Sequence, residues 1–278
     1  MTFSIIIPTY NAADLLRQCL DSIAAQTFRN VEILIVDADS GDDTIIIARE
    51  YQLAGQPIRI ITEKDKGIYD AMNKGILASR GDWIYFMGSD DRLFDAKVLE
   101  TVQSKITAGD ELLYGDCEWL PEKVREQGPC SYAKLLNRSI NHQRIFYKCT
   151  LFEAIKPFNL DYKIAADYEL NIRLFCNPGV IKRYMSLPIA YYHSGGFSAD
   201  KVDEPFWDNW ENILLKSFKP HLPETQVYER LAWYCWYKIR QRKYAEGIKL
   251  FANIFRHTRS FRFVKHTASQ TIKSISTQ

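Results

Sequence analysis

The chain has 278 residues, of which 46% are hydrophobic and 25% are charged, a composition that excludes a disordered chain and allows a sizeable core. No run approaches the roughly 18 apolar residues of a membrane-spanning helix, and Met1–Pro8 lacks the basic leader and long apolar run of a signal peptide. Residues 229–278 hold 11 of the 36 Lys and Arg but 2 of the 34 Asp and Glu, so a basic tail follows an acidic body. A basic segment such as 229–278 is typical of binding to an anionic partner or of packing against the acidic residues 1–228.

Residues 3–91 alternate between strand and helix patterns. Short apolar runs predict buried strands at Phe3–Ile7, Val31–Val36, Ile58–Thr62 and Trp83–Met87. Apolar residues at helical spacing between them predict helices over 15–23, from about Thr44, and over 71–76. Strands separated by helices of this length imply βαβ units with right-handed crossovers, and so an α/β fold with a parallel sheet.

The pattern after residue 95 is less regular. It predicts a helix near 96–106, a strand over 112–114, a helix near 165–175 and a loop over 188–206. We expect one α/β domain over 1–204 and a helical extension, rich in Trp, Tyr, Lys and Arg, over 205–278. The six cysteines form no Cys-x-x-Cys pair, which indicates reduced thiols in a cytosolic protein rather than a zinc site or a disulfide framework.

Polar residues follow the carboxyl ends of three predicted strands. These tips are Thr9–Asn11, Asp37–Ser40 and Ser89–Asp91. Ligands of open α/β sheets bind at this edge. Three tips with acidic, amide or hydroxyl groups therefore predict a site of nucleotide size.

Asp90 and Asp91 form the tip with the most specific chemistry. Two adjacent carboxylates repel each other unless a cation or hydrogen-bond donors neutralise them. Mg²⁺ or Mn²⁺ takes one or two protein carboxylates and completes its shell with phosphate oxygens and water. A solvated turn or a helix N-cap explains many isolated Asp pairs, but the buried strand before this pair and the other acidic tips favour a cation that binds a diphosphate.

The second tip contains Asp37, Asp39 and Asp42 and matches two other motifs imperfectly. It begins like an EF-hand loop, but Ala48 stands where a bidentate Glu is required. It also resembles the Asp-x-Asp of haloacid-dehalogenase-type phosphatases, except that it follows the second strand and has Gly41 where that motif has Thr or Val. A hydrogen bond from Asp37 to a base or ribose fits better, and capping of the next helix explains the other two aspartates equally well.

Five segments together resemble family 2 glycosyltransferases of the GT-A fold. They are Ser-Ile-Ile-Ile-Pro-Thr-Tyr-Asn (4–11), Leu-Asp-Ser-Ile-Ala-Ala-Gln-Thr-Phe (20–28), Glu-Ile-Leu-Ile-Val-Asp (32–37), Asp-Lys-Gly-Ile-Tyr-Asp-Ala-Met-Asn-Lys-Gly-Ile (65–76) and Ala-Ala-Asp-Tyr-Glu-Leu-Asn-Ile-Arg-Leu (165–174). The fourth resembles a bacterial subgroup that builds exopolysaccharide, capsule or O-antigen, and the fifth is similar to the family's catalytic segment. The resemblance implies a mostly parallel GT-A sheet flanked by helices, with a C-terminal helical extension.

The resemblance also implies roles for the residues at the tips. Those along the nucleotide would be Pro8, Thr9, Tyr10 and Asn11, with Asp37 towards the base or ribose. At the third tip, Asp90 would contact the ribose side and Asp91 would bind Mg²⁺ or Mn²⁺ directly.

Asp167 would be the general base that takes the proton of the acceptor hydroxyl. Such a base must stay ionised near neutrality within hydrogen-bond reach of that hydroxyl, and attack opposite the departing diphosphate inverts the anomeric carbon. Glu169 is the alternative base, but a helix turns it about 200° away. Two positions depart from the family, because Ala38 stands where a second Asp is common and Ala166 where Glu usually precedes the base. The second departure leaves the orientation of Asp167 open.

Several further residues are expected near the site. Lys66 would pair with phosphate and Asp70 with the donor sugar, although a solvated helix start explains both. His193, before Gly195 and Gly196, resembles the late histidine of many GT-A enzymes that touches the metal or diphosphate, although a lone His is more often structural. The segment 141–143 would border the acceptor cleft.

The extension mixes aromatic and basic residues. They are Trp233, Tyr234, Trp236, Tyr237, Lys238, Arg240, Arg242 and Lys243. The mixture suits a membrane interface with anionic headgroups, and also a helical hairpin whose aromatic rings pack on the catalytic domain. Nucleic acid is not expected, because the body of the chain is acidic.

The sequence thus predicts a metal-dependent, inverting glycosyltransferase. It would move a sugar from a nucleotide-sugar donor, of the UDP-sugar class, to a growing cell-surface glycan or a lipid-linked saccharide, in the cytoplasm or peripherally at the inner face of the cell membrane. One rival is a sugar-1-phosphate nucleotidylyltransferase, but the Gly-rich, basic loop expected after the first strand is replaced by Pro-Thr-Tyr-Asn-Ala. A second is a non-catalytic glycan- or membrane-binding protein that kept the fold.

Overall fold

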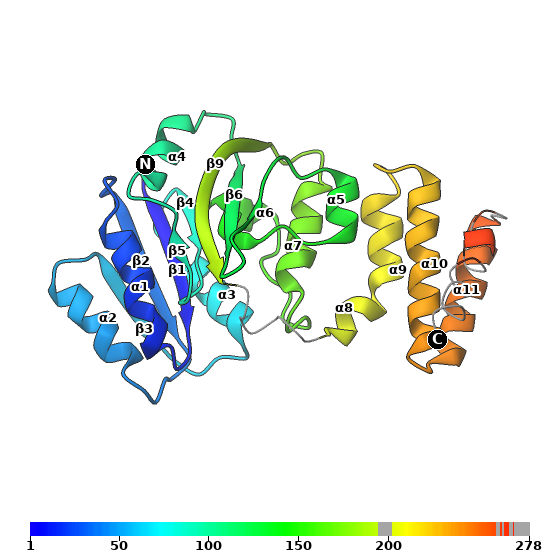
Figure 1. The fold of residues 1–278 in the computed structure, drawn as a ribbon, viewed down its shortest axis with the longest axis horizontal. Coiled ribbons are helices and arrows are strands. Elements are labelled where there is room, and N and C mark those ends of the chain that lie inside the picture. Colours follow the sequence, from blue (N-terminus) through cyan, green and yellow to red (C-terminus); the bar gives the residue numbers. More distant parts are fainter. Residues whose placement is uncertain (194–201, 260–261, 263, 267–268, 270–278) are drawn as a thin grey trace. The chain divides into compact units, whose positions relative to one another are not determined.

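The computed structural model describes residues 1–193, 202–259, 262, 264–266 and 269. The chain divides into two compact units, Met1–Phe206 and Trp207–Gln278. The first unit contains a sheet flanked by helices, and the described part of the second is helical (Figure 1). None of the described helices is both long enough and apolar enough to cross a membrane.

The amino-terminal half of the first unit alternates strands and helices, as predicted. Its elements are β1 (Phe3–Thr9), α1 (Ala13–Ala24), β2 (Val31–Asp37), α2 (Thr44–Leu53), β3 (Ile58–Thr62), α3 (Ile68–Ala78) and β4 (Trp83–Phe86). Strands β3, β2, β1 and β4 lie side by side in that order, and all three pairings are parallel. The carboxyl ends of these strands therefore meet at one edge, where the three polar tips lie.

Strand β1 is buried along its whole length because helices cover both faces of the sheet. Phe3, Ile5 and Ile7 join the core that contains the apolar face of α1. Ile6 points the other way and packs so closely on Gly75 of α3 that a Cβ there would overlap its side chain. A strand buried on both faces has a continuous apolar sequence, and each such side chain contributes about 1.5–3 kcal/mol by leaving water.

The second half of this unit extends the sheet with mixed pairings. Its elements are β5 (Arg92–Leu93), α4 (Val98–Lys105), β6 (Leu112–Leu120), β7 (Val124–Glu126), α5 (Tyr132–Asn137), η1 (His142–Arg144), β8 (Ile145–Lys148), α6 (Leu151–Ala154), α7 (Ala166–Phe175), β9 (Lys182–His193) and α8 (Glu204–Asp208). Among the described residues, nine strands form one sheet in the order β3-β2-β1-β4-β8-β6-β9-β5, with β7 on β6. Strand β8 is antiparallel to both β4 and β6.

The predicted loop over 188–206 is wrong at both ends, because residues 188–193 belong to strand β9 and residues 204–206 to helix α8. Strand β9 pairs in parallel with β6, and the register shifts next to Asp116, which lies opposite Pro188. Proline has no N–H to donate and usually marks the end of a strand. At an irregularity in the ladder its missing donor is tolerated. The rest of the predicted loop includes residues 194–201, which lie outside the described residues.

The described part of the second unit contains α9 (Trp210–Ile213), the π-helix η2 (Leu214–Phe218), α10 (Glu224–Arg240) and α11 (Tyr244–Thr258). Helices α10 and α11 pack against each other as a hairpin. Tyr234 of α10 is buried, whereas Trp233, Trp236 and Tyr237 are partly exposed. The predicted aromatic cluster is therefore in part the core of this unit.

Candidate functional site

The first two tips meet because β1 and β2 are parallel neighbours, with Thr9 opposite Asp37. Thr9 Oγ1 donates a hydrogen bond to Asp37 Oδ1 at 2.9 Å. Ser40 donates to the same carboxylate, from its backbone N to Oδ2 at 2.9 Å and from Oγ to Oδ1 at 2.5 Å. The buried Asp37 carboxylate thus shapes the turn at the ligand-binding edge, and its contact with a base or ribose stays a prediction.

Strand β1 leads from a buried end into an exposed segment. Pro8 and Thr9 are buried, whereas Tyr10 is 67% exposed. Asn11 has a positive φ of 47°, which asparagine tolerates better than most residues, and its Oδ1 accepts a hydrogen bond from Gly41 N at 3.0 Å. Of the four residues predicted along the nucleotide, Tyr10 and Asn11 therefore offer exposed side chains, and the other two would act through their backbone.

The third tip turns sharply after β4 because Gly88 lets both carboxylates approach its backbone. A Cβ on Gly88 would lie 2.6 Å from Asp91 Oδ2 and 2.7 Å from Asp90 Oδ1. Gly88 N donates to Asp91 Oδ2 at 2.8 Å, and Gln143 Nε2 donates to the same oxygen at 2.7 Å. Asp91 is 1% exposed. Burial, followed by the negative charge of Asp90, raises the pKa of Asp91 to about 6.

Asp90 and His193 lie on either side of this buried carboxylate. Asp90 is partly exposed. His193 ends β9, its side chain is exposed, and its backbone N donates to Asp91 Oδ1 at 3.3 Å. The structure thus brings His193 to the third tip through its backbone, and a contact of its imidazole with metal or diphosphate stays a prediction.

Asp167 lies at the start of α7, facing α3. Its Oδ1 accepts a hydrogen bond from Tyr168 N at 2.7 Å and lies 3.1 Å from Tyr69 Oη, whose single proton is shared with the closer Ile164 O at 2.6 Å. Its Oδ2 lies 3.7 Å from Nδ1 of His142, and its side chain is 20% exposed. The carboxylate that was predicted to be the base is accessible and is held by groups from two other parts of the chain.

The segment before β8 connects the two acidic regions. Gln143 contacts Asp91, and its neighbour His142 faces Asp167. The sequence associated residues 141–143 with an acceptor cleft, but it gave no signal of these contacts because they join positions far apart in the chain. The one available signal was the run of four polar residues, 141–144, directly before an apolar strand.

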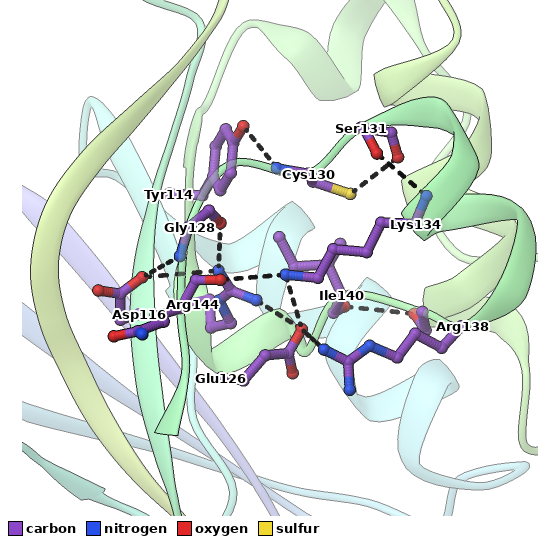
Figure 2. Close-up of polar contacts among 12 residues, drawn as sticks. Tyr114, Asp116, Glu126, Gly128, Cys130, Ser131, Lys134, Arg138, Ile140 and Arg144 are labelled. Atoms are coloured by element: carbon purple, nitrogen blue, oxygen red, sulfur yellow. Dashed lines mark hydrogen bonds and ion pairs between the residues drawn. The ribbon is translucent and has the colours of Figure 1, made fainter. Parts of the chain in front are cut away.

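Arg144, which directly follows this segment, makes the polar contacts drawn in Figure 2. It is completely buried. Its guanidinium donates to Gly115 O at 2.7 Å, to Glu126 Oε1 at 2.6 Å and to Gly128 O at 3.1 Å. Lys134 and Arg138 approach the same carboxylate, with nitrogen–oxygen distances of 3.8 and 3.6 Å. A paired and hydrogen-bonded charge is the form in which Arg is tolerated in a core, and here it ties η1 to the β6–β7 hairpin.

Lys66 and Asp70 lie at the start of α3. Asp70 Oδ2 accepts from Lys66 N at 3.0 Å and lies 3.5 Å from Lys74 Nζ. These contacts agree with a structural role at the start of a helix, which was the alternative to binding phosphate and sugar. The Lys66 side chain is exposed, and Asp70 directly follows Tyr69, the residue of α3 that contacts Asp167. Their contacts with phosphate and sugar stay predictions.

The donor set at the third tip fits a hard divalent cation that is held only in part by protein. Within the described ranges, no group of three or more His, Cys, Asp or Glu is arranged to hold a metal. Mg²⁺ and Mn²⁺ bind through one or two carboxylates and take their other ligands from phosphate and water. Asp90 and Asp91 supply two carboxylates beside the buried turn, and the charge of a cation would offset the cost of ionising Asp91 there.

Comparison with known proteins agrees with this architecture. A curated relative, the PGL/p-HBAD biosynthesis glycosyltransferase of Mycobacterium tuberculosis, is 42% identical over 209 residues, which are 73% of this chain and 82% of the relative. S. aureus TarS in complex with UDP-GlcNAc superposes with a TM-score of 0.67 at 21% identity, over 84% of this chain and 71% of that structure. The mannosyltransferase PcManGT of Pyrobaculum calidifontis, in complex with GDP-Man and Mn²⁺, superposes with a TM-score of 0.58 at 17% identity, over 97% of this chain and 86% of that one.

The two structural likenesses establish the GT-A-type fold, and the family follows from the sequence comparisons. The model of the family described as glycosyl transferase family 2 matches residues 4–153, more than half of the chain. This match includes β1, β2 and β4 with all three polar tips. The chain is therefore a glycosyltransferase that belongs to glycosyl transferase family 2.

Proposed function

We propose that the protein is an inverting glycosyltransferase that uses a nucleotide-diphosphate donor of the UDP-sugar class and a divalent cation. The observation that carries this proposal is the separation of three carboxylates into two sets. Asp90 and Asp91 lie at the sheet edge beside the nucleotide tips, and Asp167 lies across segment 141–143, partly exposed and held by Tyr69. One set suits a cation and a diphosphate, and the other suits proton removal.

Similar proteins support the substrate classes. The S. aureus structure contains UDP-GlcNAc, and the Pyrobaculum structure contains GDP-Man with Mn²⁺, so both hold nucleotide-sugars on this fold. The mycobacterial relative is named for PGL/p-HBAD biosynthesis. We therefore propose as acceptor the hydroxyl group of a growing cell-surface glycan or of a lipid-linked saccharide.

In the proposed reaction, Asp167 Oδ2 takes the proton of the acceptor hydroxyl as its oxygen attacks the anomeric carbon. The bond from this carbon to the diphosphate oxygen breaks, its electron pair leaves with the diphosphate, and attack from the opposite face inverts the configuration. A divalent cation bound at the third tip would neutralise the charge on the departing diphosphate. Tyr168 N and Tyr69 contact Oδ1, so we assign proton removal to Oδ2.

Burial favours roles for Asp90 and Asp91 that differ from those expected from the sequence. Both oxygens of Asp91 accept hydrogen bonds from protein groups, and its side chain is covered. Asp90 is more accessible. We therefore propose that Asp90 is the direct ligand of Mg²⁺ or Mn²⁺ and that Asp91 holds the turn and Gln143 in place, whereas the sequence alone favoured Asp91 as the ligand.

We also propose that the reaction takes place on the cytoplasmic face of the membrane. Support comes from six free cysteines, which suit a reducing compartment, and from the basic and aromatic surface of α10 and α11, which suits anionic lipid.

Nucleotide-sugar turnover tests the proposal directly. A panel of UDP- and GDP-sugars with Mn²⁺ or Mg²⁺ should reveal release of nucleoside diphosphate with at least one donor. Asp167→Asn should lower kcat by about 10²–10⁴-fold and leave the calorimetric Kd of UDP with Mn²⁺ unchanged. Asp90→Asn should abolish the effect of Mn²⁺ on UDP binding, whereas Asp91→Asn should retain it in part.

Two results would overturn the proposal. If nucleotide binding depends neither on the identity of the nucleotide nor on Mn²⁺, the protein is a binding module and not a glycosyltransferase of the proposed kind. Full turnover by Asp167→Asn would remove Asp167 from its role, and Glu169→Gln would then be the variant to compare.

A further inference from the structure

The two oxygens of Asp167 have different surroundings. Oδ1 accepts a hydrogen bond from Tyr168 N and lies 3.1 Å from Tyr69 Oη, which also contacts Ile164 O. Oδ2 faces Nδ1 of His142 at 3.7 Å and accepts no hydrogen bond within the part of the chain that the structure describes. In proteins without substrate, catalytic hydrogen bonds are often long and tighten when substrate binds. His142 is therefore in place to hold the oxygen that the proposed reaction uses.

The backbone around His142 is fixed by three separate elements. Tyr85 Oη of β4 donates to Gln143 O at 2.9 Å, and Asn171 Nδ2 of α7 donates to Ile140 O at 2.7 Å. Arg144, two residues after His142, binds the β6–β7 hairpin and the loop that follows (Figure 2). Since α7 also carries Asp167, the same helix that presents the base holds the segment that presents His142.

Several polar atoms in the side chains of residues 141–143 make no hydrogen bond to the described part of the protein. Asn141 Nδ2, His142 Nε2 and Gln143 Oε1 are all buried, and none has a hydrogen-bond partner among the residues described. Buried polar atoms in a folded protein are normally paired. Three successive exceptions between Asp91 and Asp167 indicate a segment built for a reaction rather than for packing.

We infer that His142 is the positioning residue of Asp167. Its Nδ1 lies 3.7 Å from Oδ2 and would donate to this oxygen as the site tightens around the acceptor, while Tyr168 N and Tyr69 contact Oδ1, so that both oxygens of the carboxylate have a neighbour that orients them. The inference rests on the proposed function, in that it assigns a partner to the proposed base.

A double-mutant cycle tests this inference. His142→Leu should lower kcat about tenfold or more with the donor KM changed less than about twofold, and His142→Asn should recover most of the loss because its amide can donate near the place of Nδ1. In the Asp167→Asn background, His142→Leu should have no further effect, because it acts through the carboxylate. His221→Asn, in the second unit, is the matched control and should keep wild-type kcat.

Urea unfolding of the wild type, His142→Leu, Asp167→Asn and the double variant tests the contact without any substrate. A non-additive effect of His142→Leu and Asp167→Asn on the unfolding midpoint is expected. If the wild type releases no nucleotide from any donor while the midpoints are non-additive, the proposed function fails and the contact stands. Additive effects in both measurements, or equal kcat losses for His142→Leu and His142→Asn, would overturn the inference.

Discussion

At the scale of single residues, burial separates carboxylates that look alike in the sequence. Asp37 and Asp91 are buried and accept hydrogen bonds from neighbouring turns, whereas Asp90 and Asp167 keep part of their surface exposed. Burial penalises the ionised form of a carboxyl group. We therefore propose that the buried aspartates shape the site and that the partly exposed ones meet cation and acceptor.

The raised pKa of Asp91, about 6 because of its burial, predicts a characteristic pH dependence. Between pH 4 and 6 the folded protein binds more protons at this residue than the unfolded chain does, so its contribution lowers stability as pH rises. Asp91→Asn removes this effect. In urea denaturation with EDTA, the stability of Asp91→Asn relative to wild type should improve by about 2–3 kcal/mol from pH 4 to pH 7.

Asp110→Asn is the control of opposite sign. A hydrogen bond from Arg183 lowers the pKa of Asp110, so the wild-type contribution is present above pH 4 and is lost as the pH falls further. A relative stability of Asp91→Asn that does not change with pH would contradict the assigned burial of this carboxyl group.

At the scale of elements, the site depends on a short connection as much as on the sheet. The helix η1 and the residue before it lie between strand ends, so that His142 and Gln143 face two carboxylates from different elements. The buried Arg144 keeps this connection in register with the β6–β7 hairpin. An ion cluster outside the proposed site therefore supports its geometry.

Arg144→Met should destabilise the protein strongly. It leaves the buried Glu126 without its closest cation and two backbone carbonyls without a donor, and breaking a buried pair costs about 3–5 kcal/mol. Arg17→Met breaks an exposed pair with Glu50, whose side chains are 51% and 49% exposed, and should cost far less. Equal urea midpoints for the two variants would show that the Arg144 cluster contributes no more than a surface pair.

The outer face of α11 is the element on which the membrane proposal can be tested. Ile248 is 64% exposed there, near Lys249 and Arg242. Ile248→Glu should reduce flotation of the full chain with phosphatidylglycerol vesicles, because it adds negative charge to an apolar position. Ile181, 55% exposed in the first unit, gives the matched control. Equal flotation of Ile248→Glu and Ile181→Glu would remove α11 from membrane contact.

At the scale of the whole molecule, the chain consists of two compact units, and all the residues proposed for the reaction belong to the first. A ligand stabilises the unit that binds it by mass action. UDP and Mn²⁺ at about 100 times the Kd should therefore stabilise the sheet-containing unit by roughly 2.7 kcal/mol, and EDTA should cancel the effect. Scanning calorimetry should show the shift in the transition of this unit, and an identical shift with EDTA present would contradict metal dependence.

The sequence by itself determined the parallel strands, the helices between them and the three polar tips. These features are local: apolar runs specify buried strands, and a polar tip such as Asp37 directly follows its strand. Tertiary structure alone decided that β9 continues through Pro188, that Arg144 is buried, and that His142 and Gln143 join Asp167 to Asp91. Register and burial depend on pairings between segments far apart in the chain, so no pattern within one segment contains them.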